Sequence, residues 1–99
     1  NKKKTKTLEL NNLNHYRDFI SIFDLCRAII FLSKIKFNGT INIASGKSIY
    51  LKNIAKKLNK SAKKKLKFND NKVPTYLLAD IKKLKRLGFK HKYNFLNTI

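Results

Sequence analysis

The sequence predicts a small α/β fold, because strand-like and helix-like segments alternate along the chain. Short runs rich in β-branched and aromatic residues are typical of strands, and we expect strands at 18–22, 40–43 and 66–68. Each is followed by a segment with apolar residues at helical spacing. The strands are few and short for a sheet that stands alone. The expected fold is therefore α/β, with short strands and three to four helices.

The first predicted helix follows Asp24, a residue that stabilises a helix N-terminus as a cap or as a first-turn carboxylate. Apolar residues recur at helical spacing from Leu25 to Ile35, and Cys26 lies within this run. We expect this helix to be largely buried, and Cys26 to be a core residue rather than a nucleophile.

Two further helices are predicted nearer the C-terminus. The first has apolar residues on one side from Leu51 to Leu58 and lysines on the other. The second begins after Asp80, a good N-terminal cap, and ends at Gly88. Another helix is expected to start near 93–96.

The net charge of +19 comes from lysine rather than arginine. Three of the 24 basic residues are arginines, Arg17, Arg27 and Arg86, whereas recognition of phosphate geometry favours the planar fork of arginine. Lys, Asn, Ile and Phe share AT-rich codons, so a biased genome explains this composition better than a nucleic-acid surface does. Such a charge would still bind polyanions non-specifically.

A cytoplasmic location is predicted from three features of the sequence. The single cysteine, Cys26, excludes an internal disulfide and suits a reducing compartment. The first residues lack the apolar stretch of a signal peptide, and the apolar run at 25–35 is too short and too polar to span a bilayer, which needs about 20 residues. The chain begins at Asn1 and contains no methionine, which indicates processing or a fragment.

A complete set of catalytic residues is missing from the sequence. The three glycines are scattered rather than gathered in a phosphate-binding loop. None of the four tyrosines is followed by a lysine four residues later. His15 and His91 have no neighbouring cysteine or paired carboxylates, so no metal site is expected.

Four segments resemble the NAD-dependent epimerase/dehydratase family, the extended short-chain dehydrogenases/reductases that act on nucleotide sugars. YRDFISIFDLCRAI at 16–29 resembles the family's RDFI-x-V-x-D-x-x-RAI signature, and GTINIASG at 39–46 resembles G-x-x-YNIGSG. VPTYLLADIKKL at 73–84 is similar to VP-x-x-x-AD-x-SK-x, and LGFKHKY at 87–93 to LGWKPKY. The four motifs occur in the family's order and span nearly the whole chain.

The resemblance implies that residues 1–99 are the small, mixed C-terminal substrate-binding region of a Rossmann-type enzyme. The parent protein would be an epimerase, dehydratase or reductase of the kind used in surface polysaccharide biosynthesis, acting as a homodimer. Its Rossmann domain, absent from this chain, would lie upstream in the same polypeptide and would carry NAD or NADP and the Tyr-x-x-x-Lys pair. The chain alone would then be inactive, and the apolar run at 25–35 would leave an exposed patch where the upstream domain belongs.

The resemblance assigns Arg17 to the diphosphate of a nucleoside diphosphate sugar, because the Arg of the RDF motif makes this contact in the family. Asp18 and Asp24 are expected to be structural and to hold backbone groups at the strand-to-helix turn.

Two further candidates come from a departure from the family pattern. Where members carry R-x-G-D before VP, this chain has Asn69, Asp70, Asn71 and Lys72. Lys72 could offer a point charge to a phosphate, and Asn69 is the second candidate. LNNLN at 10–14 resembles the GNL of GDP-mannose dehydratases, which favours a GDP-type sugar.

Two alternatives remain open from the sequence. A small nucleic-acid-binding module would use the lysine-rich helices at 51–58 and 81–87 and would bind with a strong salt dependence. A stand-alone interaction domain would require the chain to fold cooperatively by itself.

Overall fold

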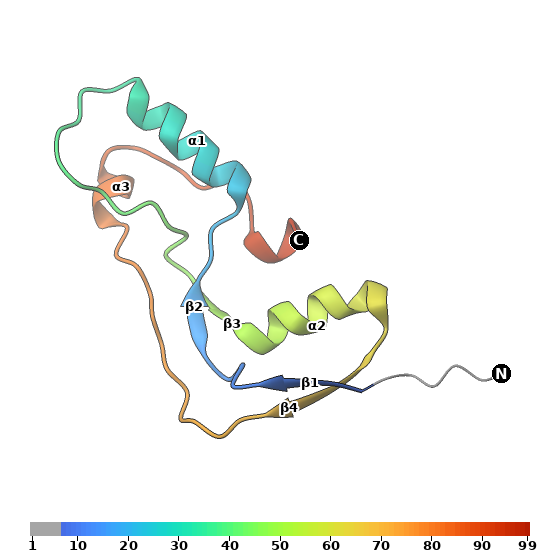
Figure 1. Ribbon diagram of the computed structural model, residues 1–99. Coiled ribbons are helices and arrows are strands. Elements are labelled where there is room, and N and C mark those ends of the chain that lie inside the picture. Colours follow the sequence, from blue (N-terminus) through green and yellow to red (C-terminus); the bar gives the residue numbers. More distant parts are fainter. Residues whose placement is uncertain (1–6) are drawn as a thin grey trace.

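The protein is flat and elongated in the computed structural model, which describes residues 7–99. Its extents are 63 × 32 × 15 Å and its radius of gyration is 17.7 Å, whereas a compact chain of this length has about 13 Å. Figure 1 shows α1 at one end and α2, β1 and β4 at the other.

The sheet at the second end joins the two most distant strands. β1 (Thr7–Asn11) runs parallel to β4 (Lys65–Asn69), from Thr7 beside Lys65 to Asn11 beside Asn69. β4 confirms the strand predicted at 66–68, but β1 was not predicted. α2 (Leu51–Ala62) connects β3 (Ser48–Tyr50) to the turn before β4 and confirms the second predicted helix.

β2 (Tyr16–Asp18) lies in the middle of the molecule, and another segment of the same chain pairs with each of its two edges. β3 pairs with it in antiparallel fashion, and the segment 75–77 joins its other edge in parallel through hydrogen bonds of 2.8 Å and 3.1 Å. Tyr16 therefore stands between Tyr50 and Tyr76, with ring centroids 4.6 Å apart on both sides.

α1 (Ile22–Ser33) begins earlier than predicted. Ser21, not Asp24, is its N-cap, because the Ser21 hydroxyl accepts a hydrogen bond of 3.2 Å from the amide of Phe23. The predicted strand at 18–22 is therefore wrong beyond Asp18. Asp24 lies in the first turn of the helix, the second of the two positions that we expected.

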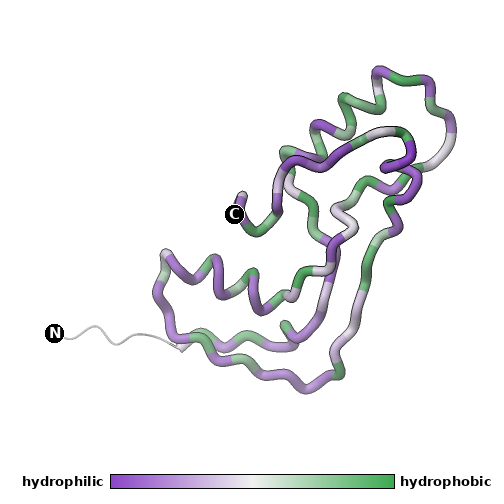
Figure 2. Tube along the Cα trace, turned by 180° about the vertical axis from the view of Figure 1, so that it is seen from behind, coloured by the Kyte–Doolittle hydropathy of each residue, from purple (hydrophilic) through white to green (hydrophobic). Residues whose placement is uncertain are grey.

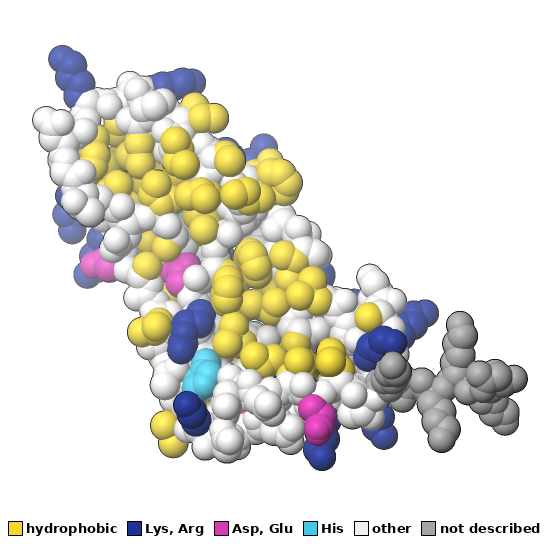
Figure 3. Space-filling view, in the orientation of Figure 1, with side chains coloured by type: hydrophobic (Ala, Val, Ile, Leu, Met, Phe, Trp, Pro, Cys, Tyr) yellow, Lys and Arg dark blue, Asp and Glu magenta, His cyan; other side chains and the backbone are white. Residues whose placement is uncertain are grey.

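The expectation that α1 would be largely buried is wrong for this chain, in which Asp24 and Ala28 are its buried residues. Cys26 is exposed rather than part of the core. It lies in a stripe at helical spacing that also contains three exposed isoleucines, Ile22, Ile29 and Ile30. Figure 2 shows how hydrophobic residues concentrate along α1, and Figure 3 shows apolar side chains over α1 that continue towards α2. The predicted apolar patch is thus confirmed.

The core is small and lies between α1 and α3 (Lys82–Arg86). Its buried members are Ala28, Leu84 and Phe89, and Ile41 and Ile43 pack against them. The strand predicted at 40–43 is wrong, because none of the described residues pairs with this segment as a neighbouring strand. Its apolar side chains contribute to the core without a sheet.

The C-terminal elements follow the predicted order. Asp80 Oδ1 accepts a hydrogen bond of 2.9 Å from the amide of Lys82, and Gly88 ends the helical segment with a φ of +106°. A short 3-10 helix (Phe95–Asn97) occupies the place of the last predicted helix.

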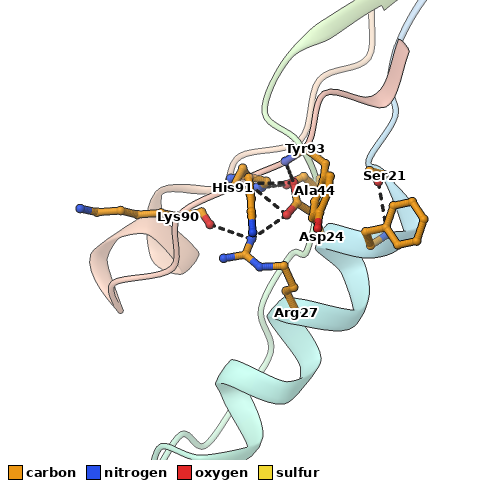
Figure 4. Close-up of polar contacts among 9 residues, drawn as sticks. Ser21, Asp24, Arg27, Ala44, Lys90, His91 and Tyr93 are labelled. Atoms are coloured by element: carbon orange, nitrogen blue, oxygen red, sulfur yellow. Dashed lines mark hydrogen bonds and ion pairs between the residues drawn. The ribbon is translucent and has the colours of Figure 1, made fainter. Parts of the chain in front are cut away.

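A buried carboxylate holds the start of α1 against the C-terminal segment (Figure 4). Asp24 is 0% exposed and accepts from the amides of Lys92 at 3.0 Å and Tyr93 at 2.9 Å. Arg27 contacts the same carboxylate at 2.7 Å and donates to the carbonyl of Lys90. Burial by itself would raise the pKa of Asp24, but these hydrogen bonds and the charge of Arg27 lower it below its usual value.

Protonation of Asp24 is expected to release the segment around Lys92 and Tyr93. Because the pKa is lowered in the folded state, the stabilisation is complete above about pH 5 and is lost as the pH falls through the lowered pKa, below about pH 4. Hydrogen-exchange protection of the Tyr93 amide should fall about tenfold or more over this range. Asp24→Asn should show the reduced protection already at neutral pH; full protection in this variant would contradict the assigned role.

Candidate functional site

Arg17 lies in the centre of β2, opposite Ile49 of β3. Its Nη1 donates to the carbonyl of Tyr16 at 2.7 Å and to that of Thr75 at 3.2 Å. Its Nη2 donates to the hydroxyl of Thr75 at 2.8 Å. Both terminal nitrogens of the guanidinium are therefore bonded to the segment beside β2.

These contacts leave one edge of the Arg17 guanidinium available. The group carries five N–H donors, and the three hydrogen bonds use two on Nη1 and one on Nη2. No residue within 7–99 accepts a hydrogen bond from Nε. Nε and the remaining N–H of Nη2 form the second fork of an arginine, which can hold two oxygens of one phosphate or carboxylate.

A shallow hollow adjoins Arg17. It is lined by Arg17, Asp18, Leu77, Leu78 and Ala79, and the two leucines are exposed. A more enclosed cavity of about 200 Å³ lies elsewhere, where Phe19 stacks on Phe95. The buried charge beside that cavity is Asp24, whose oxygens accept from two backbone amides and from Arg27. Lys47 also lines that cavity, but we place the candidate site at Arg17, whose unused donors belong to a planar group that hydrogen bonds hold in place.

Asp18 holds the loop that leads into β3. Its carboxylate accepts from the amides of Ser45 and Gly46, both at 2.8 Å, and from the hydroxyl of Ser45 at 2.7 Å. Gly46 has a φ of +71°, and a Cβ there would come within 2.5 Å of Ile81 Cδ1. The expected structural role of Asp18 is confirmed, although its partners lie in a distant loop rather than at its own turn.

The other two candidates lie along the segment that runs beside β2. The carbonyl of Lys72 accepts from Asn14 Nδ2 at 2.7 Å, which puts Lys72 beside residue 14, three positions before Arg17. Asn69 ends β4, and its amide donates to Asn11 Oδ1 at 3.2 Å. Asn11, the residue beside Asn69, lies six positions before Arg17, a distance of up to about 20 Å in an extended chain. The structure thus brings Lys72 nearer to Arg17 than Asn69, and both assignments stay predictions.

Sequence reasoning missed two residues at this site. Thr75 accepts both fork bonds from Arg17, and His15 Nδ1 lies 3.0 Å from the Thr75 amide and 2.9 Å from its hydroxyl. Thr75 is part of the VPT segment, but nothing in a single sequence indicates that it meets Arg17 across 58 positions.

The described residues contain neither a cluster of metal ligands nor a membrane-spanning helix. No three His, Cys, Asp or Glu side chains there gather as metal ligands. None of the helices between residues 7 and 99 is long and apolar enough to cross a membrane.

Comparisons with known proteins agree with this architecture, although no family model matches the chain. A curated relative, GDP-6-deoxy-D-talose 4-dehydrogenase from Aggregatibacter actinomycetemcomitans, is 53% identical over 45 residues, which are 44% of this chain and 15% of that protein. The structure of GDP-mannoheptose C4 reductase from Campylobacter jejuni with NADP bound matches 94% of the chain, at 25% identity and a TM-score of 0.73. These comparisons confirm the resemblance to the NAD-dependent epimerase/dehydratase family.

A second solved enzyme matches the fold of this chain to a similar extent. UDP-glucuronic acid 4-epimerase from Bacillus cereus, in complex with NAD, matches 95% of the chain at 25% identity and a TM-score of 0.70. The matched fold is the C-terminal region of extended short-chain dehydrogenases/reductases. The chain spans about a third of the length of these solved enzymes, 32% of each.

Asp18→Asn is expected to free the loop at Ser45 and Gly46. The amide side chain offers one acceptor oxygen where the carboxylate offers two, so one backbone amide loses a charged partner worth about 1.5–3 kcal/mol. Hydrogen exchange of the Gly46 amide should accelerate about tenfold or more. Asp70→Asn, which removes an equal charge from the partner of Lys52, should leave Gly46 unchanged; acceleration in both variants would point to a general effect of charge.

Proposed function

We propose that this chain binds the nucleoside diphosphate sugar in an NAD(P)-dependent nucleotide-sugar epimerase, dehydratase or reductase. The observation that carries the proposal is the unused edge of Arg17, held open by the bonds of its other edge to Thr75. A diphosphate presents pairs of anionic oxygens, and an arginine fork binds such pairs with charge-assisted hydrogen bonds.

The surroundings of Arg17 support this assignment. The Asp18 carboxylate accepts from three donors of the distant loop, so it is not paired with the guanidinium. Leu77 and Leu78 give the hollow an apolar wall, suited to the less polar parts of a bound nucleotide. Lys72, on the segment beside β2, adds positive charge that can approach a second phosphate oxygen.

The cofactor would be held outside this chain. The three glycines stand at separate turns, each with a positive φ, and do not form the glycine-rich loop that carries a dinucleotide. An upstream Rossmann domain of the same polypeptide would bind NAD or NADP, whose nicotinamide accepts or returns a hydride. Residues 1–99 would contribute substrate binding, and by themselves they would not catalyse the reaction.

A GDP sugar is the favoured substrate class within this proposal. The curated relative and the Campylobacter jejuni reductase both carry GDP sugars in their names. A further solved relative from that organism, a GDP-6-OMe-4-keto-L-xylo-heptose reductase, matches 94% of the chain at 26% identity and a TM-score of 0.71. The segment LNNLN at 10–14 points in the same direction.

The exposed stripe of α1 would be covered by the upstream domain. Ile22, Ile29 and Ile30 are each more than half exposed, and burying a side chain of this type is worth about 1.5–3 kcal/mol. An apolar helix face that is exposed in this way is normally buried against another layer of secondary structure.

Arg17→Ala is expected to weaken GDP binding by the full-length protein by about 1.5–3 kcal/mol, a rise in Kd of roughly 10- to 150-fold. Isothermal titration calorimetry at about 0.15 M salt measures this while screening the general attraction of the +19 chain for anions. Lys60→Ala removes an equal charge from α2 and should leave the Kd unchanged.

An unchanged GDP affinity in Arg17→Ala would contradict the site. Equal losses in Arg17→Ala and Lys60→Ala would instead assign binding to the net charge of the chain and favour the polyanion-binding alternative.

A further inference from the structure

We propose that Thr75 and His15 are positioning residues that aim the free edge of Arg17 at the diphosphate. The inference rests on the proposed function and adds to it two side chains that shape the binding site without being assigned to touch the substrate.

Thr75 fixes the rotation of the guanidinium. Its carbonyl and its hydroxyl accept from the two terminal nitrogens of Arg17, at 3.2 Å and 2.8 Å. Two bonds from one planar group to one residue define the plane of that group as well as its direction. The Thr75 carbonyl is itself held by the amide of Tyr16 at 2.8 Å, so the platform for Arg17 is part of the strand pairing.

His15 fixes the Thr75 hydroxyl. His15 Nδ1 accepts from the Thr75 amide at 3.0 Å, which requires an unprotonated Nδ1 with a lone pair towards Thr75. The hydroxyl oxygen lies 2.9 Å from the same nitrogen, so the Thr75 hydroxyl and the Thr75 amide share the single lone pair of Nδ1 in a three-centre hydrogen bond. A hydroxyl that donates to His15 directs its lone pairs elsewhere, and one of them meets Arg17 Nη2.

The result is a directional chain from His15 through Thr75 to Arg17. His15 is anchored in turn by its own carbonyl, which accepts from the amide of Leu51 at 2.9 Å. A free arginine side chain loses much of its rotamer freedom when a ligand immobilises it. A guanidinium that is already oriented avoids that loss at the moment of binding, so the affinity for the diphosphate is higher.

This account separates the phosphate contact from the rest of the nucleotide. If Thr75 and His15 act through Arg17, their removal weakens binding of GDP and leaves binding of guanosine, which lacks phosphates, unchanged. A general structural role would lower both affinities or the melting temperature.

The test measures Kd for GDP and for guanosine by calorimetry in the full-length protein. Thr75→Val removes the hydroxyl at nearly constant shape, and we expect the Kd for GDP to rise roughly tenfold with the Kd for guanosine unchanged. Thr75→Ser keeps the hydroxyl and should restore most of the GDP affinity. In an Arg17→Ala background, Thr75→Val should have no further effect.

His15 provides an independent pair of variants. His15→Asn places an amide oxygen near the position of Nδ1 and should bind GDP better than His15→Leu, which offers no acceptor. If Thr75→Val does not fold, the difference in GDP affinity between these two His15 variants tests the inference by itself.

Two results would overturn the inference. The first is wild-type GDP affinity in Thr75→Val together with equal affinities in the two His15 variants. The second is an equal loss for GDP and guanosine. Failure of the proposed function is recognised separately, because Arg17→Ala would then bind GDP like the wild type.

Discussion

The small size of the buried core limits how this chain can be held together. The buried cluster consists of Ala28, Leu84 and Phe89, and only Asp24 and Ala28 of α1 are buried. Hydrogen bonds to two carboxylates therefore supplement the small core. Asp24 joins the first turn of α1 to the C-terminal segment, and Asp18 joins the end of β2 to the loop before β3. Each accepts from two successive backbone amides far away in the sequence.

The same arrangement produces the candidate site. Asp18 fixes the end of β2, strand pairing on both edges fixes Tyr16 at its start, and Arg17 lies between the two. Its guanidinium is bonded on one edge to Thr75 and open on the other. The hollow beside it is shallow because residues 7–99 supply one wall, and in the proposed enzyme the upstream domain supplies the other. The same proposal accounts for the exposed face of α1.

Local signals in the sequence predicted the elements that local interactions define. α2 follows from its amphipathic pattern. α3 follows from the turn at Gly88 and from Asp80, which is not the predicted N-cap but lies one residue before the N-cap and accepts from the amide of Lys82. The predictions of strands were wrong where contacts between residues far apart in the sequence determine whether a strand forms. β1 exists through pairing with β4, and 40–43 has no strand partner among the described residues. The family motifs indicated Arg17, but no single sequence could show that Thr75 and His15 meet it, because only the strand pairing brings them together.

The central claim is that this chain is one layer of a two-layer protein, and the unfolding of residues 1–99 in urea tests it most directly. Circular dichroism and the fluorescence of a hydrophobic dye report on the helices and on the exposed apolar face. The account predicts a broad transition of low cooperativity, with dye bound in the absence of urea and excluded once the upstream domain is joined. A single sharp transition without dye binding, with an m-value of about 1–3 kcal/mol/M typical of small independent proteins, would contradict it.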